Sequence, residues 1–212
     1  MTMIIGFFYK QKLSNKLMKR LSLYLFLLLF TLQTPSQADD IRDFQIEGMS
    51  IGDSALDYFT KDQIKNAEYK MFKNDKYKTF VFYDSDYKVF DAIEIAYKKN
   101  DKKFIIASIS GGITVTNKED CLKKNDEMVN NLKDFFPESQ SMSDEGFHPA
   151  DTNGKSKYYR TAFKINPKAK YFEVEVSCIF FEGELANNYS SNAGITIKTD
   201  TFNEWVTHEA YK

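Results

Sequence analysis

The stretch NKEDCLKKNDEMVNNLKDFF, residues 117–136, decides how the rest of the chain can fold. Its apolar side chains recur at intervals of three, four and seven residues, which places them on one face of an α-helix. Thr116 with Glu119 three residues later has the pattern of a capping box, and Pro137 prevents the helix from continuing past Phe136. We therefore predict a long amphipathic helix that packs its apolar face against a core.

Two cysteines are predicted to tie this helix to a later strand. Cys121 lies near the start of the helix, and Cys178 lies in KYFEVEVSCIFF, residues 170–181, where apolar and polar side chains alternate. The alternation places Cys178 on the buried face of a strand. In an oxidising compartment, two core-facing cysteines without a CxxC motif are most simply one disulfide between Cys121 and Cys178. Without export, the alternative is two unpaired buried thiols.

The first residues favour export. From Met18 the chain reads MKRLSLYLFLLLFTLQTPSQADD, in which Lys19 and Arg20 precede a largely apolar stretch at residues 21–32 and small residues lead up to Ala38. The stretch is shorter than the roughly 20 apolar residues that a spanning helix needs, so we predict a signal peptide cleaved after Ala38. Met18 could then be the true start. The alternative is an inner-membrane anchor formed by residues 21–32.

The expected organisation is an N-terminal extension with a signal peptide at residues 1–38, followed by one periplasmic or secreted domain at residues 39–212. A chain of 212 residues with 42% hydrophobic residues can build one such core. The first 38 residues carry five basic groups and no acidic group, so the rest has 24 basic (29 less 5) and 30 acidic groups. Nucleic acid is not an expected partner, because phosphate binding needs clustered Lys and Arg.

The predicted fold class is α+β, with an antiparallel sheet of about six strands and the long helix packed on one face. Short polar links between apolar runs indicate two meanders, one before and one after the helix. The order also allows two successive helix-plus-three-strand units. The expected strands are residues 79–83, 88–97, 103–110, 157–165, 170–181 and 195–199.

Turn and cap patterns complete the prediction. Gly111 and Gly112 are expected to end the third strand, and residues 138–156 read as a long polar surface loop. Thr60 with Gln63 forms a second capping-box pattern. Two further caps are expected, Asp53 or Ser54 for a helix through Phe59, and Asp200 or Thr201 for a helix near the C-terminus.

Residues that could carry catalysis are sparse. His148 and His208 each lack a second good metal ligand nearby in sequence, and the patterns GxSxG, SxxK and HExxH are missing. Asp84, Asp86 and Asp91 lack the glycine and terminal glutamate of a calcium loop and indicate a turn. We therefore expect no catalytic, metal-binding or cofactor-binding residues, although a triad assembled from distant residues stays compatible with the sequence.

A candidate binding surface lies in IEGMSIGDSALDYF, residues 46–59. Two of its acids lie one helical turn apart and could form an acid–base pair, but a solvated first helical turn is the simpler interpretation. An exposed apolar patch here, or in the loops at residues 140–155 and 183–194, would mark a docking site. The residues assigned to this surface are Gly48, Gly52, Asp53, Asp57 and Tyr58.

The same stretch carries a family resemblance. The run IEGMSIGDSALDYF, within residues 41–59, resembles the start of the mature region in uncharacterised small exported proteins of marine bacteria with reduced genomes, and it implies no activity. Gly48, Ser50 and Gly52 before short helices and a meander are similar in order to SmpA/OmlA outer-membrane assembly lipoproteins and to beta-lactamase-inhibitor-like modules. This resemblance implies a non-catalytic envelope module, although the chain lacks a lipobox cysteine.

The sequence thus predicts an exported, non-enzymatic envelope protein that binds another protein or an envelope component. It needs no cofactor and meets the membrane only through its signal segment, unless that segment stays uncleaved. The main alternative is a small-ligand carrier or a periplasmic hydrolase. A concave pocket with two or more converging ionisable groups would favour this alternative.

Overall fold

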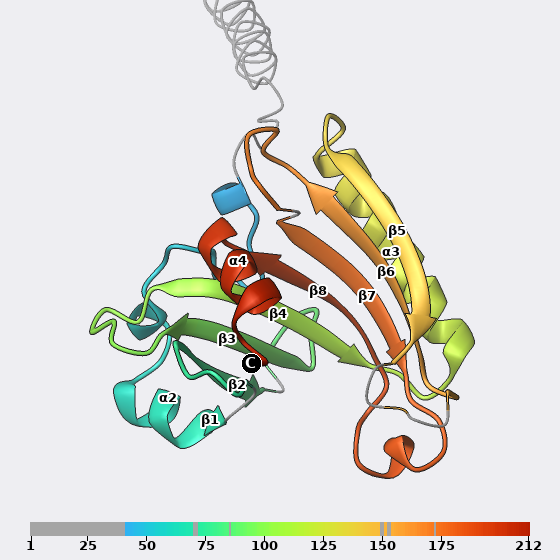
Figure 1. The fold of residues 1–212 in the computed structure, drawn as a ribbon, viewed down its shortest axis with the longest axis horizontal. Coiled ribbons are helices and arrows are strands. Elements are labelled where there is room, and N and C mark those ends of the chain that lie inside the picture. The colour runs from blue at the N-terminus through green and yellow to red at the C-terminus, as the bar shows by residue number, and fades with distance from the viewer. Residues whose placement is uncertain (1–40, 70–71, 85, 149–150, 152–153, 172) are drawn as a thin grey trace, which may run out of the picture. The chain divides into compact units, whose positions relative to one another are not determined.

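One antiparallel sheet organises the described part of the chain in the computed structural model (Figure 1). The structure describes residues 41–69, 72–84, 86–148, 151, 154–171 and 173–212. The predicted signal peptide, the cleavage site after Ala38 and the alternative anchor at residues 21–32 lie outside these residues. No helix in the described ranges is long and apolar enough to cross a membrane.

The sheet has eight strands within these residues, in the order β1-β2-β3-β4-β8-β7-β6-β5. Neighbouring strands are antiparallel throughout, and β4 pairs with β8, so two meanders meet in the middle of the sheet. The strands are β1 Glu68–Tyr69, β2 Tyr77–Tyr83, β3 Ala92–Lys98, β4 Ile106–Thr114, β5 Gln140–Phe147, β6 Lys157–Lys164, β7 Val174–Phe180 and β8 Asn192–Lys198.

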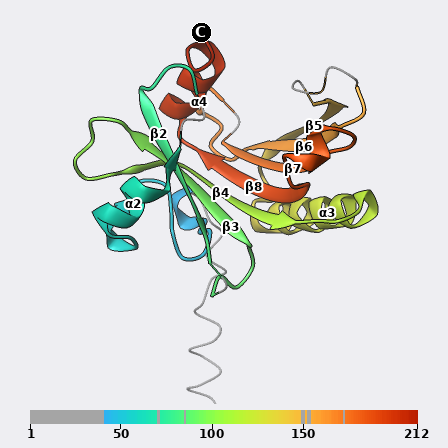
Figure 2. The ribbon, with the colours of Figure 1, turned by 90° about the horizontal axis from the view of Figure 1, so that it is seen from below.

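Helices lie on both faces of this sheet. α3 (Lys118–Phe135) packs against β7 and β8 on the face that we call the back face. α4 (Asp200–His208) packs against β4 on the opposite, front face (Figure 1, Figure 2). α2 (Lys61–Ala67) contacts β2, and its Ile64 joins the back-face core. The described residues also form short 3-10 turns at η1 Ile41–Asp43, η2 Ala55–Asp57 and η3 Leu185–Asn187.

A row of apolar side chains across the back face forms the centre of the core. Each residue of the row is paired in register with the next one on the neighbouring strand, and each is 0% exposed. Full burial of one such side chain stabilises the fold by about 1.5–3 kcal/mol. The row is Phe80, Ile95, Ile109, Ile197, Val174 and Phe163.

A smaller aromatic cluster holds α4 on the front face. Trp205 is 0% exposed, and its ring centre lies 4.8 Å from that of Phe72 and 4.8 Å from that of Tyr77. Phe202, Ala96 and Ala210 complete the cluster. The C-terminal helix thus seals the front of β2, β3 and β4.

Cys121 of α3 and Cys178 of β7 form a disulfide, which confirms the predicted pairing. Their Cα atoms lie 5.6 Å apart, and both residues are 0% exposed beside Val115 and Ala193. The long helix is therefore covalently attached to the strand that it covers.

The predicted α+β class and antiparallel sheet are confirmed, but the expected number of about six strands is too low. One additional strand is β1, which has two residues. The other is β5, which occupies part of residues 138–156, the stretch that was expected to be a loop. β5 escaped prediction because its side chains are exposed or only partly buried on both faces, so they show no alternation.

The prediction that Gly111 and Gly112 end a strand is wrong, because β4 continues through them to Thr114. A Cβ atom on Gly111 would lie 2.6 Å from the ring of Phe90. Across the sheet, a Cβ atom on Gly194 of β8 would lie 2.6 Å from the carbonyl oxygen of Gly111. Close packing, and not chain termination, requires Gly111 and Gly194.

The N-terminal caps of the two longer helices differ from the prediction by one or two residues. Asn117 caps α3, because its Oδ1 accepts a hydrogen bond from the amide of Asp120 at 2.8 Å, so the cap is not at Thr116. Thr199 caps α4 in place of the expected Asp200 or Thr201.

The two predicted caps before β1 have different outcomes. The capping box of Thr60 and Gln63 is present at the start of α2, as predicted. Ser54 is also a cap, since its side chain accepts a hydrogen bond from the amide of Leu56. However, it caps only the short turn η2, and the expected helix through Phe59 is not formed.

Candidate functional site

The predicted binding surface forms a turn that Asp53 holds together. Asp53 Oδ2 accepts hydrogen bonds from the amide of Ser50 at 2.9 Å and from the hydroxyl of Tyr58 at 2.7 Å. Gly48 and Gly52 have φ angles of 83° and 92°, which favour glycine. The hydrogen bond to Asp53, with burial and the nearby negative charge, raises the pKa of Tyr58 to about 12. Asp53 therefore fixes the turn, and the structure gives no support for an acid–base pair.

Glu47 fastens this turn to the sheet. Its carboxylate accepts hydrogen bonds from the amides of Lys88, Val89 and Phe90 at 3.0, 2.7 and 3.2 Å. Partial burial raises the pKa of Glu47, but these three amide donors outweigh burial and leave the pKa below its ordinary value. The amides of residues 88–90 serve this carboxylate, which explains why β3 begins at Ala92 and not at the predicted residue 88.

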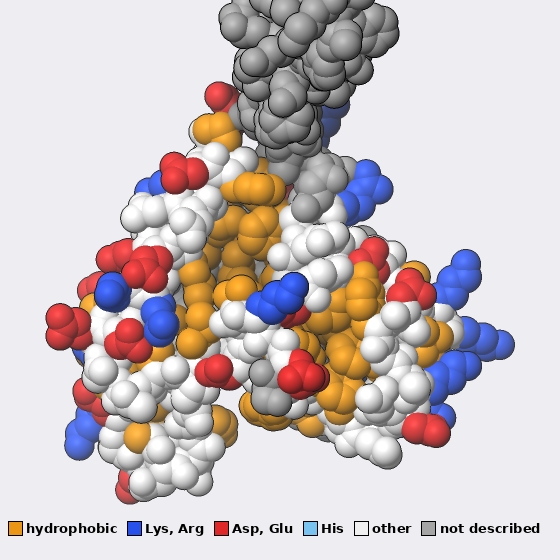
Figure 3. Space-filling model, turned by 180° about the vertical axis from the view of Figure 1, so that it is seen from behind, with side chains coloured by type: hydrophobic (Ala, Val, Ile, Leu, Met, Phe, Trp, Pro, Cys, Tyr) orange, Lys and Arg blue, Asp and Glu red, His pale blue; other side chains and the backbone are white. Residues whose placement is uncertain are grey.

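Apolar side chains reach the surface beside the fastened turn. The rings of Phe59 and Phe82 are stacked with centres 4.3 Å apart, and both residues, like Leu56, are partly buried against the core. We call Leu56, Phe59 and Phe82 the back-face patch. Tyr58 is 42% exposed and follows directly in the turn. Figure 3 shows the back of the molecule, where apolar side chains gather in zones bordered by charged groups.

The front face carries four charged side chains that alternate in sign over four strands. Arg160 donates to both carboxylate oxygens of Asp144, from Nε at 2.7 Å and from Nη2 at 2.8 Å. Glu175 Oε2 lies 3.8 Å from Arg160 Nη1 and accepts a hydrogen bond from Lys198 Nζ at 3.0 Å. We call Asp144, Arg160, Glu175 and Lys198 the charge ladder.

The contacts of the charge ladder hold its four side chains in defined positions but add little to the stability of the fold. The hydrogen bond from Arg160 holds the pKa of Asp144 below its usual range. Both side chains are about one-third exposed, at 37% for Arg160 and 33% for Asp144, so solvent screens the pair and its stabilisation is modest. Tyr158 also donates to Asp144 at 3.2 Å, and its ring lies over Gly146. The result is an ordered polar surface.

Beside the charge ladder, the front face of β4, β7 and β8 is formed by small residues. Ser110 and Thr196 are hydrogen-bonded through their hydroxyl groups at 2.9 Å, and Gly194 of β8 pairs in register with Gly112 and Ser177. A Cβ atom on Gly112 would meet nothing within 4 Å. Among the described elements, no helix lies over β5, β6 and β7 on this face (Figure 1). The part of the front face formed by β5, β6 and β7 is therefore left uncovered by the described helices.

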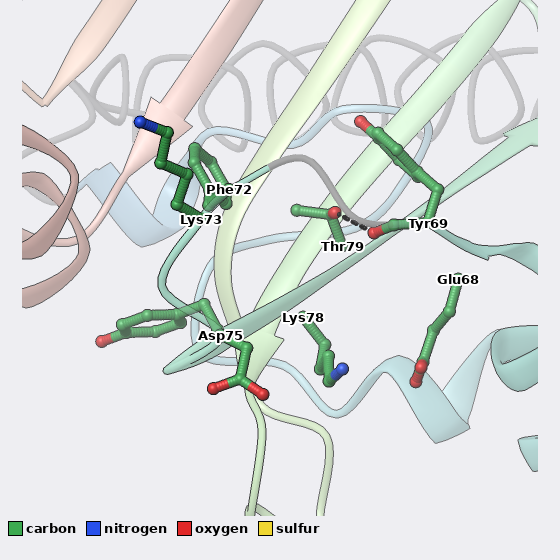
Figure 4. A pocket seen from close by; sticks show the side chains of 8 residues that line it. Glu68, Tyr69, Phe72, Lys73, Asp75, Lys78 and Thr79 are labelled. Carbon is green, nitrogen blue, oxygen red and sulfur yellow. Dashed lines mark hydrogen bonds between the residues drawn. The ribbon is translucent and has the colours of Figure 1, made fainter. Parts of the chain in front are cut away.

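A pocket of about 370 Å³ lies at the edge of the sheet, where β1 meets β2. Its charged groups are largely engaged already, because the Glu68 carboxylate accepts a hydrogen bond from the hydroxyl of Tyr97 and Asp75 pairs with Lys99. The contact with Lys99 lowers the pKa of Asp75. Figure 4 shows Lys78 between Asp75 and Glu68 in this view. The lining residues are Glu68, Tyr69, Phe72, Lys73, Asp75, Tyr77, Lys78 and Thr79.

The histidines and the aspartates of the predicted turn make contacts that explain them without a chemical role. His148 lies against the ring of Phe181, with ring centres 5.0 Å apart, and His208 Nε2 lies 3.3 Å from the Tyr171 hydroxyl. Asp84 Oδ1 accepts a hydrogen bond from the amide of Asp86, which is the predicted turn geometry. Within the described ranges, no group of three or more His, Cys, Asp or Glu residues is arranged to hold a metal ion.

No protein-family model, curated protein or solved structure matches the chain. The functional argument therefore depends on the contacts and surfaces described above. Sequence reasoning located the turn at residues 46–59 but missed Phe82, which belongs to another strand. It also missed the whole charge ladder.

Proposed function

We propose that the chain is an exported envelope protein whose body binds another protein, or a component of the envelope, without catalysis. The observation that carries this proposal is the back-face patch, in which the rings of Phe59 and Phe82 are stacked and both residues are only partly buried. Apolar groups with a polar border are typical of protein–protein contacts. Asp53 and Glu47 fix the adjacent turn, so little conformational entropy is lost on binding.

The disulfide supports the export part of this proposal. Disulfides persist in oxidising compartments such as the periplasm and the extracellular space. A periplasmic or secreted location after cleavage near Ala38 fits a buried bond between Cys121 and Cys178. A body retained at the inner membrane by residues 21–32 would fold in the same compartment. The resemblance of residues 41–59 to small exported proteins points in the same direction.

Site-specific crosslinking in the native cell tests this function. A photoreactive benzoylphenylalanine replaces Phe59, and in a matched control it replaces Glu127, which is exposed on α3. We expect a discrete crosslinked product from position 59 and none from position 127. Identical products from the two positions, or no product from position 59, would contradict a specific contact at the back-face patch.

A second candidate function, that of a small-ligand carrier, rests on the pocket between β1 and β2. Its volume of about 370 Å³ is in the range of small-molecule sites, and Asp75, Lys78 and Glu68 are among the residues that line it. Native mass spectrometry of the protein purified from its own host tests this candidate. A bound small molecule that is lost in the Lys78→Ala variant would favour a carrier, and a ligand-free mass would favour the first proposal.

We also propose that the body consists of two helix-plus-three-strand units, α2 with β2–β4 and α3 with β6–β8. The strand order β2-β3-β4-β8-β7-β6 supports this, because a twofold axis perpendicular to the sheet between β4 and β8 would produce it. α2 and α3 contribute to the same core on the back face. Superposition of one unit on the other checks the idea, since related units would bring α2 near α3.

A further inference from the structure

The two edges of the sheet differ in a way that points to self-association. β1, at one edge, has only two residues, whereas β5, at the other, has eight. β5 pairs with β6 without a register shift, from Gln140 opposite Lys164 to Phe147 opposite Lys157. No other described strand pairs with the outer side of β5. A long row of backbone donors and acceptors is thus available for another strand.

Most of the usual means of protecting an edge strand are missing from β5. Proteins protect such edges with short strands, proline, β-bulges or charged side chains, lysine above all. The sequence of β5, QSMSDEGF, contains no proline or lysine. Its two charges are Asp144, which Arg160 already binds, and the exposed Glu145. Met142 and Phe147 are 50% and 58% exposed, so apolar area accompanies the open backbone.

The hydrogen-bond pattern identifies which residues of β5 face outward. The amide of His148 donates to the carbonyl oxygen of Ser156 at 2.9 Å, which continues the β5–β6 ladder by one residue pair. In an antiparallel pair, alternate residues direct their N–H and C=O groups toward the same neighbour. The even-numbered residues of β5 therefore bond to β6. Ser141, Ser143, Glu145 and Phe147 direct their backbone groups outward.

We propose that a second copy of this chain pairs antiparallel along β5, about a twofold axis through Ser143. This register places outward-facing residues opposite outward-facing residues, as the ladder requires. It sets Ser143 opposite Ser143 of the second copy, Met142 opposite Asp144 and Ser141 opposite Glu145. No like charges lie directly opposite each other. A register centred on Glu145 would place two glutamates face to face, which is unfavourable.

The proposed axis is perpendicular to the sheet, so both copies present the same face to the same side. The two eight-stranded sheets then form one continuous sheet. The charge ladders of the two copies end on the two sides of the β5–β5 contact. The back-face patches of both copies then point in one direction. This inference needs only the geometry of β5 and stays valid if the back-face patch has another role.

Sedimentation analysis of the mature protein purified from its host tests the proposal. We expect a dimer for the wild type and a monomer for Ser143→Pro, because proline removes an outward amide while the bonds to β6 stay intact. Ser143→Thr keeps this amide and should stay dimeric. Hydrogen exchange at residues 140–147 should be slower in the dimer than in the Ser143→Pro monomer.

Charge exchange at Ser141 tests the register and does not depend on proline. Ser141→Glu places a glutamate opposite Glu145 of the second copy at two symmetric positions, so the dimer should weaken by roughly 2- to 30-fold. Ser141→Lys should strengthen the dimer, and Ser141→Glu combined with Glu145→Lys should restore it. These variants decide the matter if Ser143→Pro fails to fold.

Three results would overturn the proposal. The first is a wild type that is monomeric at its highest soluble concentration. The second is a dimer that Ser143→Pro and Ser141→Glu leave unchanged, which would locate the interface elsewhere. The third is a monomer whose amides at residues 140–147 become protected only when a different envelope protein is added, which would assign this edge to another partner.

Discussion

Gly194 and Gly112 are paired in register on β8 and β4, but their surroundings differ. A methyl group on Gly194 would collide with the backbone oxygen of Gly111 at 2.6 Å, whereas one on Gly112 would meet nothing within 4 Å. We expect Gly194→Ala to lower the free energy of unfolding by about 1–3 kcal/mol, because the strands must separate. Gly112→Ala should change it by less than about 0.5 kcal/mol. Urea unfolding measures both, and equal effects would contradict the close approach of β4 and β8.

Glu94 of β3 should make stability depend on pH. Burial raises the pKa of Glu94 above its ordinary value, although a hydrogen bond from Tyr69 opposes this shift. A folded-state pKa above the unfolded value favours the protonated form, so its stabilisation is present below the unfolded pKa and is lost as pH rises through the folded pKa. Glu94→Gln should therefore be more stable than the wild type at neutral pH.

Urea midpoints measured from acidic to neutral pH check the Glu94 prediction. The advantage of Glu94→Gln should shrink as the pH falls through the raised folded-state pKa, and it should vanish below about 4.3, the ordinary pKa of a glutamate side chain. Glu127→Gln is a suitable control, because Glu127 is exposed on α3. A pH-independent difference between wild type and Glu94→Gln would show that the effect has another origin.

At the scale of elements, the N-terminal cap of α3 can be tested directly. Asn117 accepts a hydrogen bond from the amide of Asp120, whereas the sequence pattern had favoured Thr116 as the cap. Asn117→Ala should lower the free energy of unfolding by about 1 kcal/mol. Thr116→Ala should have a much smaller effect. Thermal or urea unfolding of the two variants compares them, and a larger loss at Thr116 would restore the capping box with Glu119.

The disulfide between α3 and β7 should contribute much of the stability. Cys121 and Cys178 are 57 residues apart, for which the loss of unfolded-chain entropy corresponds to about 4 kcal/mol. Replacing both cysteines by alanine should lower the urea midpoint strongly, and reduction of the wild type should have the same direction of effect. As a control, the reductant should not change the urea midpoint of the double variant, which has no disulfide to reduce. An unaffected wild type would show that packing alone holds α3 on the sheet.

Elements with one buried face could be predicted, and elements without one could not. β7 alternates between buried and partly buried residues along its length, so the pattern around Cys178 was correctly interpreted. β5 has no buried residue, so QSMSDEGF was mistaken for a loop. Gly111 and Gly112 were interpreted as breakers because a sequence does not show the ring of Phe90 or the backbone of β8 beside them.

The candidate site was predictable only where it is local in sequence. The turn that contains Asp53 and Tyr58 is continuous, and its glycines and acid suggested it. The charge ladder combines residues from four strands, and its contacts depend on strand register, which sequence spacing does not reveal. For the same reason, Phe82 could not be assigned to the back-face patch with Phe59.

For the whole molecule, the mass of the mature protein tests the predicted export. Cleavage after Ala38 should leave Asp39 as the first residue in protein purified from the native host. Intact mass and N-terminal sequencing measure this directly. Ala38→Leu should slow processing, because the peptidase requires a small residue before the cut, while Gln37→Ser should not. A mature chain that still begins at Met1 or Met18 would favour the anchored form.

The pairing of β4 with β8 determines when the body can be completed. β4 (Ile106–Thr114) lies near the middle of the chain, but its partner β8 lies close to the C-terminus, with Ser108 opposite Lys198. When the chain is synthesised from its N-terminus, the β4 edge of the first meander therefore stays unpaired until β8 has been made. Such contacts between distant segments slow folding and leave an unfinished sheet open to aggregation. Chains truncated before residue 192 should therefore require a chaperone, however well their first half is formed.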